Sequence, residues 1–334
     1  MSKTAPKISI IIPCRNEEKF IGKCLDSLVA QGFPADRLEI LVVNGASEDK
    51  TEEVIRSYVQ KYPFVKLLQS PQKCTPISMN VGLKNATGDV VMIVGAHSDL
   101  EPGYVRKCVQ YLYQYDADAV GGILITKPAT QTLAAKAIVA VLTSFFGTGG
   151  SRFRMKRGGG IQESDTVFNG CYRREVFEKI GYFNEKLFGS QDFELNLRLK
   201  KAGGKILLAP NIATAYYPKA TLKEFFKHNI KDGIWAILPM KYGAPPFKLR
   251  HLIPLFFVLG VIGPFILSIW YRPFIFLTLG VLGLYLLASF YFSIRIAVKE
   301  KNLLLIPFLV AAFAVRHFGY GFGSFIGLFR LITG

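Results

Sequence analysis

One carboxylate in this sequence stands where a catalytic base would be expected. Asp192 falls in the first turn of a helix predicted over residues 191–199, and a helix N-terminus favours the ionised form of a carboxylate. An ionised carboxylate that is held in place can take a proton from a hydroxyl group. A helix cap uses the same residue type, so the position fits a structural role as well as a catalytic one.

Four cations lie close together in a glycine-rich segment, residues 149–160. They are Arg152, Arg154, Lys156 and Arg157. The guanidinium group of arginine forms paired hydrogen bonds with phosphate oxygens, and mobile loops that close over substrates use such groups. A solvated loop is the alternative. We favour a phosphate clamp because the rest of the chain predicts a ligand crevice.

Three polar clusters each follow an apolar run that predicts a buried parallel strand. The predicted strands cover residues 8–12, 38–43, 65–68 and 90–94, and the polar clusters are residues 13–17, 44–49 and 95–101. Helical patterns separate the strands, with Asn16 and Ser47 as expected N-caps. In an open α/β sheet, ligands bind beyond the carboxyl ends of the strands. We therefore expect the polar clusters to converge on one crevice.

The expected crevice lacks the motifs of the common nucleotide folds. No G-x-G-x-x-G follows the first strand and the chain has no Walker loop, which excludes a dinucleotide site and a P-loop. Polar and acidic strand ends favour instead a nucleotide that is held by side chains, with a hard cation as a further candidate.

Composition narrows the class of protein. Of the 334 residues, 50% are hydrophobic and 19% are charged, which excludes disordered and collagen-like chains. The net charge of +17 would suit nucleic acid, but no zinc-finger, RNP or homeodomain pattern accompanies it. Anionic lipids and a nucleotide diphosphate are the expected counter-charges. Five scattered cysteines favour reduced thiols, and no apolar signal segment opens the chain, so we expect a cytoplasmic globular part.

The apolar residues gather at the C-terminal end. Three stretches, at about 252–270, 273–298 and 303–331, are each long enough for a membrane-spanning helix. Lysines and arginines before the first and third stretches predict an external turn at 271–273. Arg316 and His317 fall inside the third stretch, where a charge is costly and faces either a partner helix or a lipid phosphate. We predict a globular domain over 1–242 and a multi-pass membrane domain over 243–334, with two, three or four crossings of the plasma membrane.

The order of the motifs resembles that of inverting GT-A glycosyltransferases of family 2, in particular the succinoglycan-type membrane β-glucosyltransferases. The resemblance covers about residues 1–242 and implies a Rossmann-like, mostly parallel sheet. The matching segments are 11–18, 44–51, 80–82, 88–89, 95–97, 147–154, 169–177, 191–192 and 228–235. Any one of these segments would be weak, but their common order and spacing are specific.

The resemblance implies a role for individual residues. The nucleoside of a UDP-sugar would be held by Pro13, Arg15, Glu17 and Asn44, while the strand end at Ala96 would meet the ribose and the diphosphate. Asp192 would take the proton from the acceptor hydroxyl as its oxygen attacks the anomeric carbon. The acceptor would be contacted by Gln191, His228, Lys231 and Trp235. The basic residues 152–157 would neutralise the departing diphosphate.

Several positions depart from the pattern that the resemblance implies. Asn44 and Gly95 replace aspartates, Gln191 replaces an acid, and His228 and Lys231 replace a glutamine and an arginine. The change at Gly95 matters most because that carboxylate would lie near the metal or the ribose. A divalent cation would then be held by His97 and Asp99, a ligand pair that suits Mn2+ better than Mg2+. Otherwise the protein is metal-independent or inactive.

With the apolar C-terminal stretches, the resemblance implies a membrane-bound enzyme that moves a sugar from a nucleotide donor to a lipid-linked or polysaccharide acceptor. The nearest alternative is a polyprenyl-phosphate sugar synthase, whose acceptor is the lipid phosphate itself. The alternative of a different class is a non-catalytic protein that binds a glycan, a nucleotide or a partner enzyme.

Overall fold

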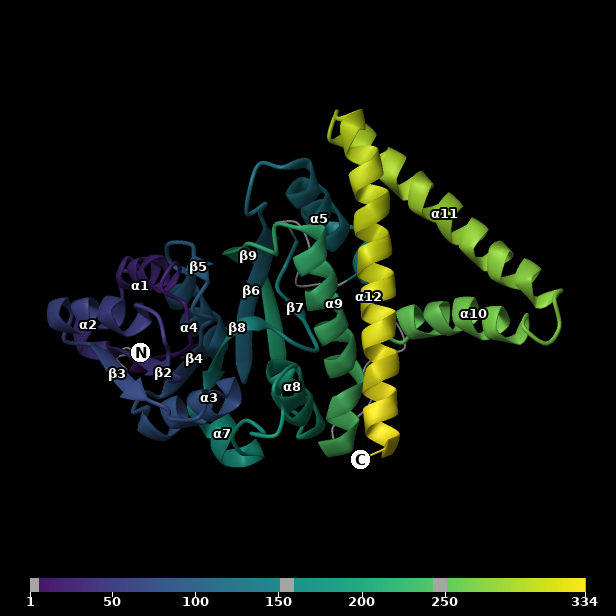
Figure 1. Cartoon of the computed structure of the whole chain (residues 1–334). Coiled ribbons are helices and arrows are strands. Elements are labelled where there is room, and N and C mark those ends of the chain that lie inside the picture. The colour runs from purple at the N-terminus through teal and green to yellow at the C-terminus, as the bar shows by residue number, and fades with distance from the viewer. Residues whose placement is uncertain (1–5, 151–158, 243–250, 334) are drawn as a thin grey trace. The chain divides into compact units, whose positions relative to one another are not determined.

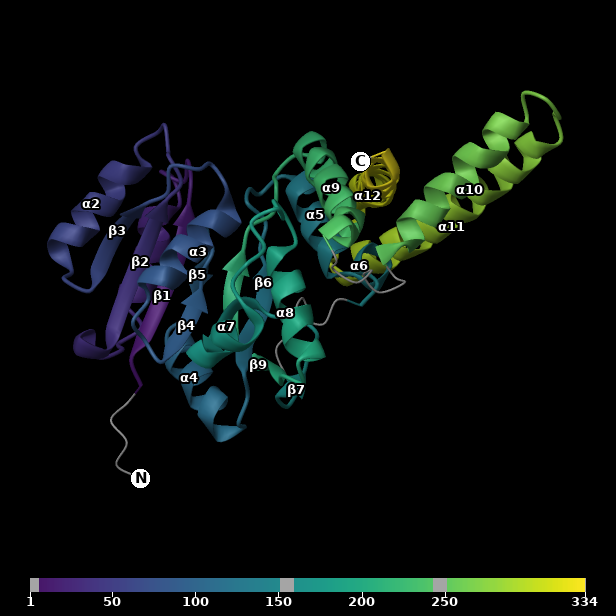
Figure 2. The same ribbon diagram turned by 90° about the horizontal axis from the view of Figure 1, so that it is seen from below.

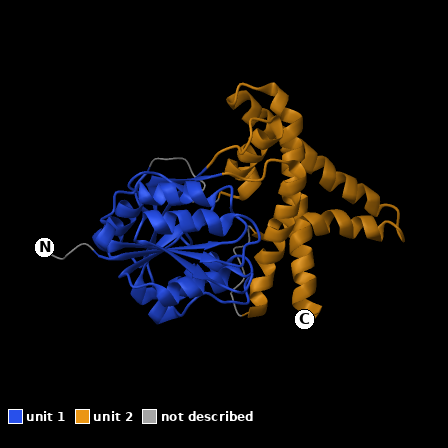
Figure 3. Cartoon of the chain, turned by 60° about the vertical axis from the view of Figure 1, so that its left-hand side comes forward, with its two compact units in different colours: residues 1–125, 152–216 blue, residues 126–151, 217–334 orange. Residues whose placement is uncertain are grey.

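The computed structural model describes residues 6–150, 159–242 and 251–333. The chain divides into two compact units (Figure 3). Unit 1 takes residues 1–125 and 152–216, and unit 2 takes residues 126–151 and 217–334. Both units are thus built from two separate stretches of the chain.

Unit 1 is organised around a mixed sheet whose strand order is β3-β2-β1-β4-β8-β6-β9-β5, with β7 paired to β9. Its parallel part consists of β1 (Ile8–Cys14), β2 (Leu38–Asn44), β3 (Val65–Gln69) and β4 (Val90–Ile93). The remaining strands are β5 (Asp99–Leu100), β6 (Ala119–Thr126), β7 (Gln162–Glu163), β8 (Phe168–Arg173) and β9 (Ile206–Tyr216). Strand β8 is antiparallel to both β4 and β6. The four predicted strands are confirmed, and the antiparallel strands complete the sheet.

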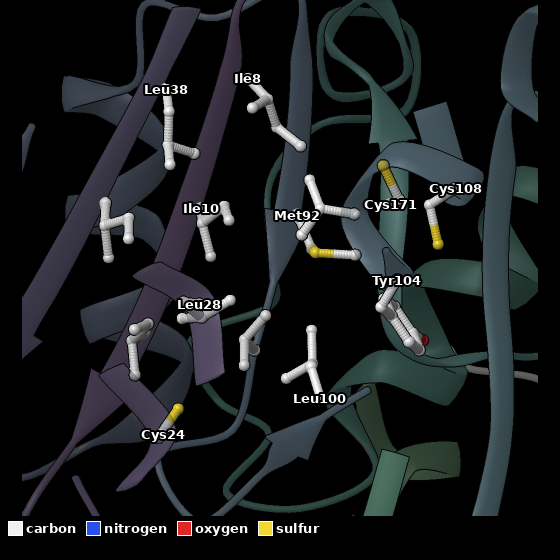
Figure 4. Packing of buried hydrophobic residues seen from close by; sticks show 14 of the residues in the cluster. Ile8, Ile10, Cys24, Leu28, Leu38, Met92, Leu100, Tyr104, Cys108 and Cys171 are labelled. Atoms are coloured by element: carbon white, nitrogen blue, oxygen red, sulfur yellow. The ribbon is translucent and has the colours of Figure 1, made fainter. Parts of the chain in front are cut away.

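Helices cover both faces of this sheet (Figures 1 and 2). They are α1 (Ile21–Val29), η1 (Ala35–Arg37), α2 (Thr51–Lys61), α3 (Thr75–Asn85), α4 (Tyr104–Gln114), α7 (Arg174–Ile180) and α8 (Gln191–Lys201). Ile8, Ile10 and Ile12 point into a core that α1, α2 and α4 close, where Ile10 lies beside Met92 of the neighbouring strand (Figure 4). Ile11 points into the opposite core, with α3, α7 and α8. A strand buried on both faces explains why residues 8–12 are apolar except for Ser9.

One charged side chain is buried within the sheet. The Glu39 carboxylate on β2 is 2% exposed and accepts hydrogen bonds from Ser9 Oγ (2.5 Å), Thr87 N (2.6 Å), Thr87 Oγ1 (2.8 Å) and Lys66 Nζ (3.2 Å). Burial alone would raise the pKa of Glu39, but these donors outweigh it and lower the pKa to about 2. The ionised form therefore stabilises the fold.

A change in pH should reveal this contribution. The pKa of Glu39 is lowered on folding, so its stabilisation is present above the ordinary glutamate pKa and is lost as the pH falls toward about 2. The difference in free energy of unfolding between the wild type and Glu39→Gln should shrink by about 3 kcal/mol over that range. Chemical unfolding in detergent at a series of pH values measures it. A difference that does not vary with pH would contradict the account.

Unit 2 is helical. Its elements are α5 (Leu133–Thr143), α6 (Phe145–Thr148), α9 (Leu222–Ile237), η3 (Leu238–Tyr242), α10 (Ile253–Leu267), α11 (Phe274–Lys299), η5 (Leu303–Leu305) and α12 (Ile306–Thr333). Within the described residues, two helices are long and apolar enough to cross a membrane: α11 and the segment 303–333. The first predicted stretch, 252–270, forms the shorter helix α10. The predicted boundary between residues 242 and 243 borders residues outside the described ranges.

Candidate functional site

The loops after β1 and β2 hold each other in place. Asn16 has a positive φ of 54°; its backbone N–H donates to Ser47 Oγ (3.0 Å) and its side-chain Oδ1 accepts from Glu48 N (2.9 Å). In the same way, Glu17 N donates to Thr51 Oγ1 (2.7 Å). The prediction that Asn16 and Ser47 cap helices was wrong: these side chains bond to the other loop, while α1 and α2 follow Phe20 and Lys50.

A cavity of about 260 Å³ opens in unit 1 beyond the carboxyl ends of the strands. Its wall includes residues from all three predicted polar clusters, namely Pro13, Cys14, Arg15, Glu17, Gly45, Gly95, Ala96 and His97. Gln191 and Asp192, at the start of α8, lie in the same wall. The expected convergence of these segments on one crevice is therefore seen in the structure.

Asp192 is the most perturbed acid in this cavity. It lies in the first turn of α8, after Ser190, whose φ is 58°. Burial raises its pKa to about 6, which is opposite in direction to the effect of a helix N-terminus. Desolvation is therefore the larger effect here. A carboxylate with this pKa is ionised at neutral pH and is more basic than an ordinary aspartate, as a general base requires.

The pKa of Asp192 predicts the acid side of the pH–rate profile. If Asp192 accepts the proton, kcat/KM should rise as the pH increases from about 5 to about 7, with a midpoint near the raised pKa of about 6. Initial rates measured with saturating donor and varied acceptor test this. A rate that is flat across this interval would show that ionisation of Asp192 does not control the reaction.

The cavity wall also contains the thiol of Cys14. Burial, with Glu17 as the next cause, raises the pKa of Cys14 to about 12. The thiol is therefore neutral at physiological pH and is a poor nucleophile. All five cysteines are buried and unpaired by disulfide bonds, in agreement with the reduced thiols expected from their spacing.

Asn169 lines the cavity, although no role of its own was predicted for it from the sequence. It lies on β8 with a positive φ of 47°, and it is 5% exposed. Its Oδ1 accepts from Gly95 N (3.2 Å) and its Nδ2 donates to Ser98 Oγ (3.1 Å) and Thr214 Oγ1 (3.2 Å). Asn169 thereby fixes the loop that follows β4. Segment 169–177 had been recognised as a motif, but its sequence does not show which loop Asn169 would hold.

Other cavity residues were also missed. Lys73, Cys74, Thr75, Ser78, Met79, Ile93, Phe168, Gly170 and Tyr172 line the wall in addition to those already named. Lys73 adds a second cation near Arg15, and both pair with Glu48. Most of these residues come from α3 and β8. Gly170 and Tyr172 belong to the recognised segment 169–177, but the sequence assigned none of these residues to the cavity.

Asn44 is not among the residues of the cavity wall, and its side chain is hydrogen-bonded within its own loop and to α2. It is 2% exposed; its Nδ2 donates to Glu52 Oε2 (2.8 Å) and its Oδ1 accepts from Ser47 N (3.1 Å). Its neighbour Gly45 lines the cavity. Asn44 therefore shapes the loop beside the cavity, and its predicted contact with the nucleoside stays a prediction.

The two residues expected to hold a metal ion, His97 and Asp99, have different partners, and only His97 lines the cavity. His97 Nδ1 is 3.5 Å from Glu17 Oε1 in the cavity wall, whereas Asp99 Oδ2 forms an ion pair with Lys23 Nζ at 2.9 Å. Among the described residues, no group of three His, Cys, Asp or Glu side chains is placed to hold a metal ion. The residues present do not fit a metal site built by the protein alone, and we assign no reaction step to a metal.

None of the remaining predicted residues is among the described residues of this cavity wall. Arg152, Arg154, Lys156 and Arg157 fall outside the described residues. His228, Lys231 and Trp235 lie on α9 of unit 2, where His228 Nε2 is 3.6 Å from Asp232 Oδ1. The assignment of these residues to phosphate and acceptor binding stays a prediction.

Comparison with known proteins identifies the family. Residues 9–181 match the family model described as glycosyl transferase family 2. The chain belongs to glycosyltransferase family 2. A family 2 enzyme transfers a sugar from a nucleotide-sugar donor, so the predicted class of enzyme is confirmed.

Two relatives show how far the similarity extends. A Methanococcus voltae protein named dolichyl N-acetyl-alpha-D-glucosaminyl phosphate 3-beta-D-2,3-diacetamido-2,3-dideoxy-beta-D-glucuronosyltransferase is 30% identical over 97% of this chain and 97% of its own. The succinoglycan biosynthesis protein ExoA of Rhizobium meliloti is 26% identical over 71% of this chain and 76% of its own. The predicted resemblance to succinoglycan-type enzymes is thus confirmed.

Solved structures share the GT-A fold. The mannosyltransferase PcManGT from Pyrobaculum calidifontis, in complex with GDP-Man and Mn2+, has a TM-score of 0.59 at 18% identity and covers 95% of this chain and 88% of its own. S. aureus TarS 1-349 in complex with UDP-GlcNAc has a TM-score of 0.53 at 17% identity, over 95% and 90%. The predicted fold class is confirmed.

Proposed function

We propose that this family 2 glycosyltransferase is membrane-attached and transfers a sugar from a UDP-sugar to a hydroxyl group of a lipid-linked glycan, with Asp192 as the general base. The observation that carries this proposal is the cavity described in unit 1, where a carboxylate with a raised pKa lies in the same wall as the three strand-end loops. The Methanococcus voltae relative, whose name specifies a dolichyl-phosphate-linked acceptor sugar, supports the lipid-linked acceptor.

The proposed reaction is a single displacement. The acceptor oxygen attacks the anomeric carbon, and its proton passes to Asp192. The bond between that carbon and the diphosphate oxygen breaks, and the nucleoside diphosphate leaves with the electron pair. Attack on one face and departure from the other invert the anomeric configuration. Arg15 and Lys73 give the cavity wall two cations that would stabilise the leaving diphosphate.

Membrane attachment is proposed for unit 2. Its helices α10 and α11 expose large apolar side chains such as Phe256 (57%) and Leu284 (71%), which a lipid environment would cover. The cations at Lys241, Arg295 and Lys299 favour a cytoplasmic location for the rest of the chain. A lipid-linked acceptor would then be available at the same membrane surface.

The proposed activity can be tested with purified full-length protein. Incubation with individual nucleotide sugars, Mn2+ and a membrane lipid extract should release nucleoside diphosphate and place the sugar on lipid. Omitting the lipid extract should abolish the transfer. If no donor is consumed under any of these conditions, the protein acts as a binding partner and the proposed function is wrong.

Whether the cavity wall at Gly95 contacts a metal ion has a separate test. A Cβ added there would lie 3.3 Å from Ser98 Oγ and 4.0 Å from His97 Cε1, so a side chain fits after a small shift of Ser98. Gly95→Asp should restore a carboxylate beside His97 and tighten Mn2+ binding by about tenfold or more, as measured by titration calorimetry with UDP present. Gly95→Asn is the uncharged control. Equal Mn2+ affinity in the wild type and both variants would show that this corner does not contact a cation.

A further inference from the structure

Helix α9 presents two different faces. Lys223, Lys227 and Lys231, spaced by four residues, are exposed and form one face, which we call the lysine stripe. The opposite face consists of the buried residues Phe225, Asn229, Gly233, Ala236 and Ile237. A helix with an apolar face against protein and a basic face toward solvent is suited to an anionic surface.

The buried face of α9 packs along α12, and both helices run in the same direction (Figures 1 and 2). Glycines permit this close approach. A Cβ added to Gly319 would lie 3.2 Å from the carbonyl oxygen of Phe226, and one added to Gly327 would lie 2.9 Å from that of Ile234. Midway between them, a Cβ on Gly323 would overlap the carbonyl oxygen of Ile230. These three contacts fix the level of each α9 residue along α12.

This register places the lysine stripe beside the middle of α12. Phe226 lies level with Gly319 and Ile230 lies level with Gly323, so Lys227 lies close to the midpoint of Ile306–Thr333. If α12 crossed a bilayer, about 20 of its residues would lie in hydrocarbon, and the whole stripe would lie there too. Each exposed lysine near the bilayer centre disfavours insertion by roughly 100-fold. A crossing α12 is therefore incompatible with its contacts to α9.

The charge within α12 fits the same conclusion. Arg316 donates to Asp232 Oδ2 (3.4 Å), to Asn229 Oδ1 and to the carbonyl oxygen of Gly147 (3.3 Å). Its guanidinium carbon also lies 5.0 Å from the centre of the Tyr320 ring. Arg316 was expected to face either a partner helix or a lipid phosphate, and in the structure it faces a partner helix, α9. The residue joins α12 to α9 and α6 instead of facing lipid.

We propose that α9 and α12 form a platform that lies on the membrane surface, where the lysine stripe binds anionic lipid headgroups, while the hairpin of α10 and α11 is the part that enters the bilayer. This inference rests on the membrane attachment in the proposed function. The charge of the stripe selects an anionic surface, and the exposed apolar hairpin in the same unit gives a second reason to expect a membrane. Each lysine near such a surface contributes about 1 kcal/mol, which is roughly a fivefold effect on lipid association.

Sidedness of labelling decides between a platform and a crossing. Single cysteines are introduced at Glu300, Thr333, Lys227 and Leu284, and sealed vesicles of one orientation are treated with a membrane-impermeant maleimide. The five native cysteines are buried and serve as the background. A platform predicts labelling of positions 227, 300 and 333 from the same side, with position 284 protected. Labelling of positions 300 and 333 from opposite sides, or protection of position 227, would overturn the proposal.

Labelling at position 284 distinguishes a failure of the proposed membrane attachment from a failure of the platform alone. If a cysteine at residue 284 is labelled as readily as one at residue 227, the hairpin is not in the bilayer. The membrane attachment in the proposed function then fails, whereas sugar transfer by unit 1 can still be measured. If position 284 is protected and the two ends of α12 label from opposite sides, only the platform fails.

The selectivity of the protein for anionic lipids tests whether lipid headgroups bind the lysine stripe. Spin-labelled phosphatidylglycerol and phosphatidylcholine are compared for association with the full-length protein in reconstituted bilayers. The Lys223→Gln, Lys227→Gln, Lys231→Gln triple variant should lose roughly 100-fold of its preference for phosphatidylglycerol. The matched control replaces three exposed lysines of unit 1, Lys61, Lys84 and Lys201, and should keep it. Equal selectivity in both triple variants would overturn the assignment to the stripe.

Discussion

Asp192→Asn is expected to lower the rate of sugar transfer by about 10²- to 10⁴-fold, the usual contribution of a positioned general base. The amide has nearly the shape of the carboxylate but cannot accept the proton at neutral pH. Binding of the donor should change little, because the departing diphosphate is stabilised by other groups. Initial rates and donor affinity, measured on the same preparation, give both results.

Stability provides the control for this variant. Because burial raises the pKa of Asp192 on folding, the protonated form favours the folded state, and this contribution is lost as the pH rises through about 6. Asp192→Asn should therefore be at least as stable as the wild type above that pH, by up to about 3 kcal/mol. A variant that is inactive because it unfolds would contradict the assignment of a catalytic role.

The same variant discriminates between two classes of acceptor. A sugar hydroxyl must lose its proton, whereas a lipid phosphate is already ionised and needs no base. Near-normal activity of Asp192→Asn would therefore favour a polyprenyl-phosphate sugar synthase over transfer to a glycan.

Asn169→Ala is expected to lower the free energy of unfolding by about 2–4 kcal/mol and to reduce activity by at least about tenfold. The substitution removes the hydrogen-bond partner of the partly buried Gly95 N–H and of the buried Ser98 and Thr214 hydroxyls. It also places alanine at a positive φ, which asparagine tolerates better. Thermal unfolding in detergent and initial rates measure the two effects.

Asn169→Gly is the matched control because glycine relieves the backbone strain without restoring the hydrogen bonds. It should recover about 1 kcal/mol of stability relative to alanine but no activity. If either variant keeps the wild-type rate, the 95–98 loop is positioned without Asn169, and the account of the cavity wall is wrong.

The sequence predicted those parts of the fold that local patterns determine. Apart from Ser9 and Glu39, residues 8–12 and 38–43 are apolar because β1 and β2 are buried on both faces. The polar residues that follow them were correctly expected at one edge of the sheet. The antiparallel strands β6, β8 and β9 could not be placed in the sheet from a local sequence pattern, since their pairing joins residues that are far apart in the sequence. The role of Asn169 depends on that pairing.

Local patterns failed where a long-range contact outweighed them. Asn16 and Ser47 have the composition of helix caps, but a neighbouring loop supplies better partners. Asp192 stands at a helix N-terminus, but burial dominates its pKa. Arg316 looked misplaced in an apolar stretch because its ion-pair partner, Asp232, lies on a helix that is far away in the sequence.

The central claim is a single displacement by an acceptor hydroxyl that Asp192 deprotonates. The anomeric configuration of the new bond tests it most directly. With an α-linked nucleotide sugar as donor, proton NMR of the isolated product should show a β-linkage. An α-linkage would require two displacements or a front-side attack, and would contradict the mechanism proposed for this cavity.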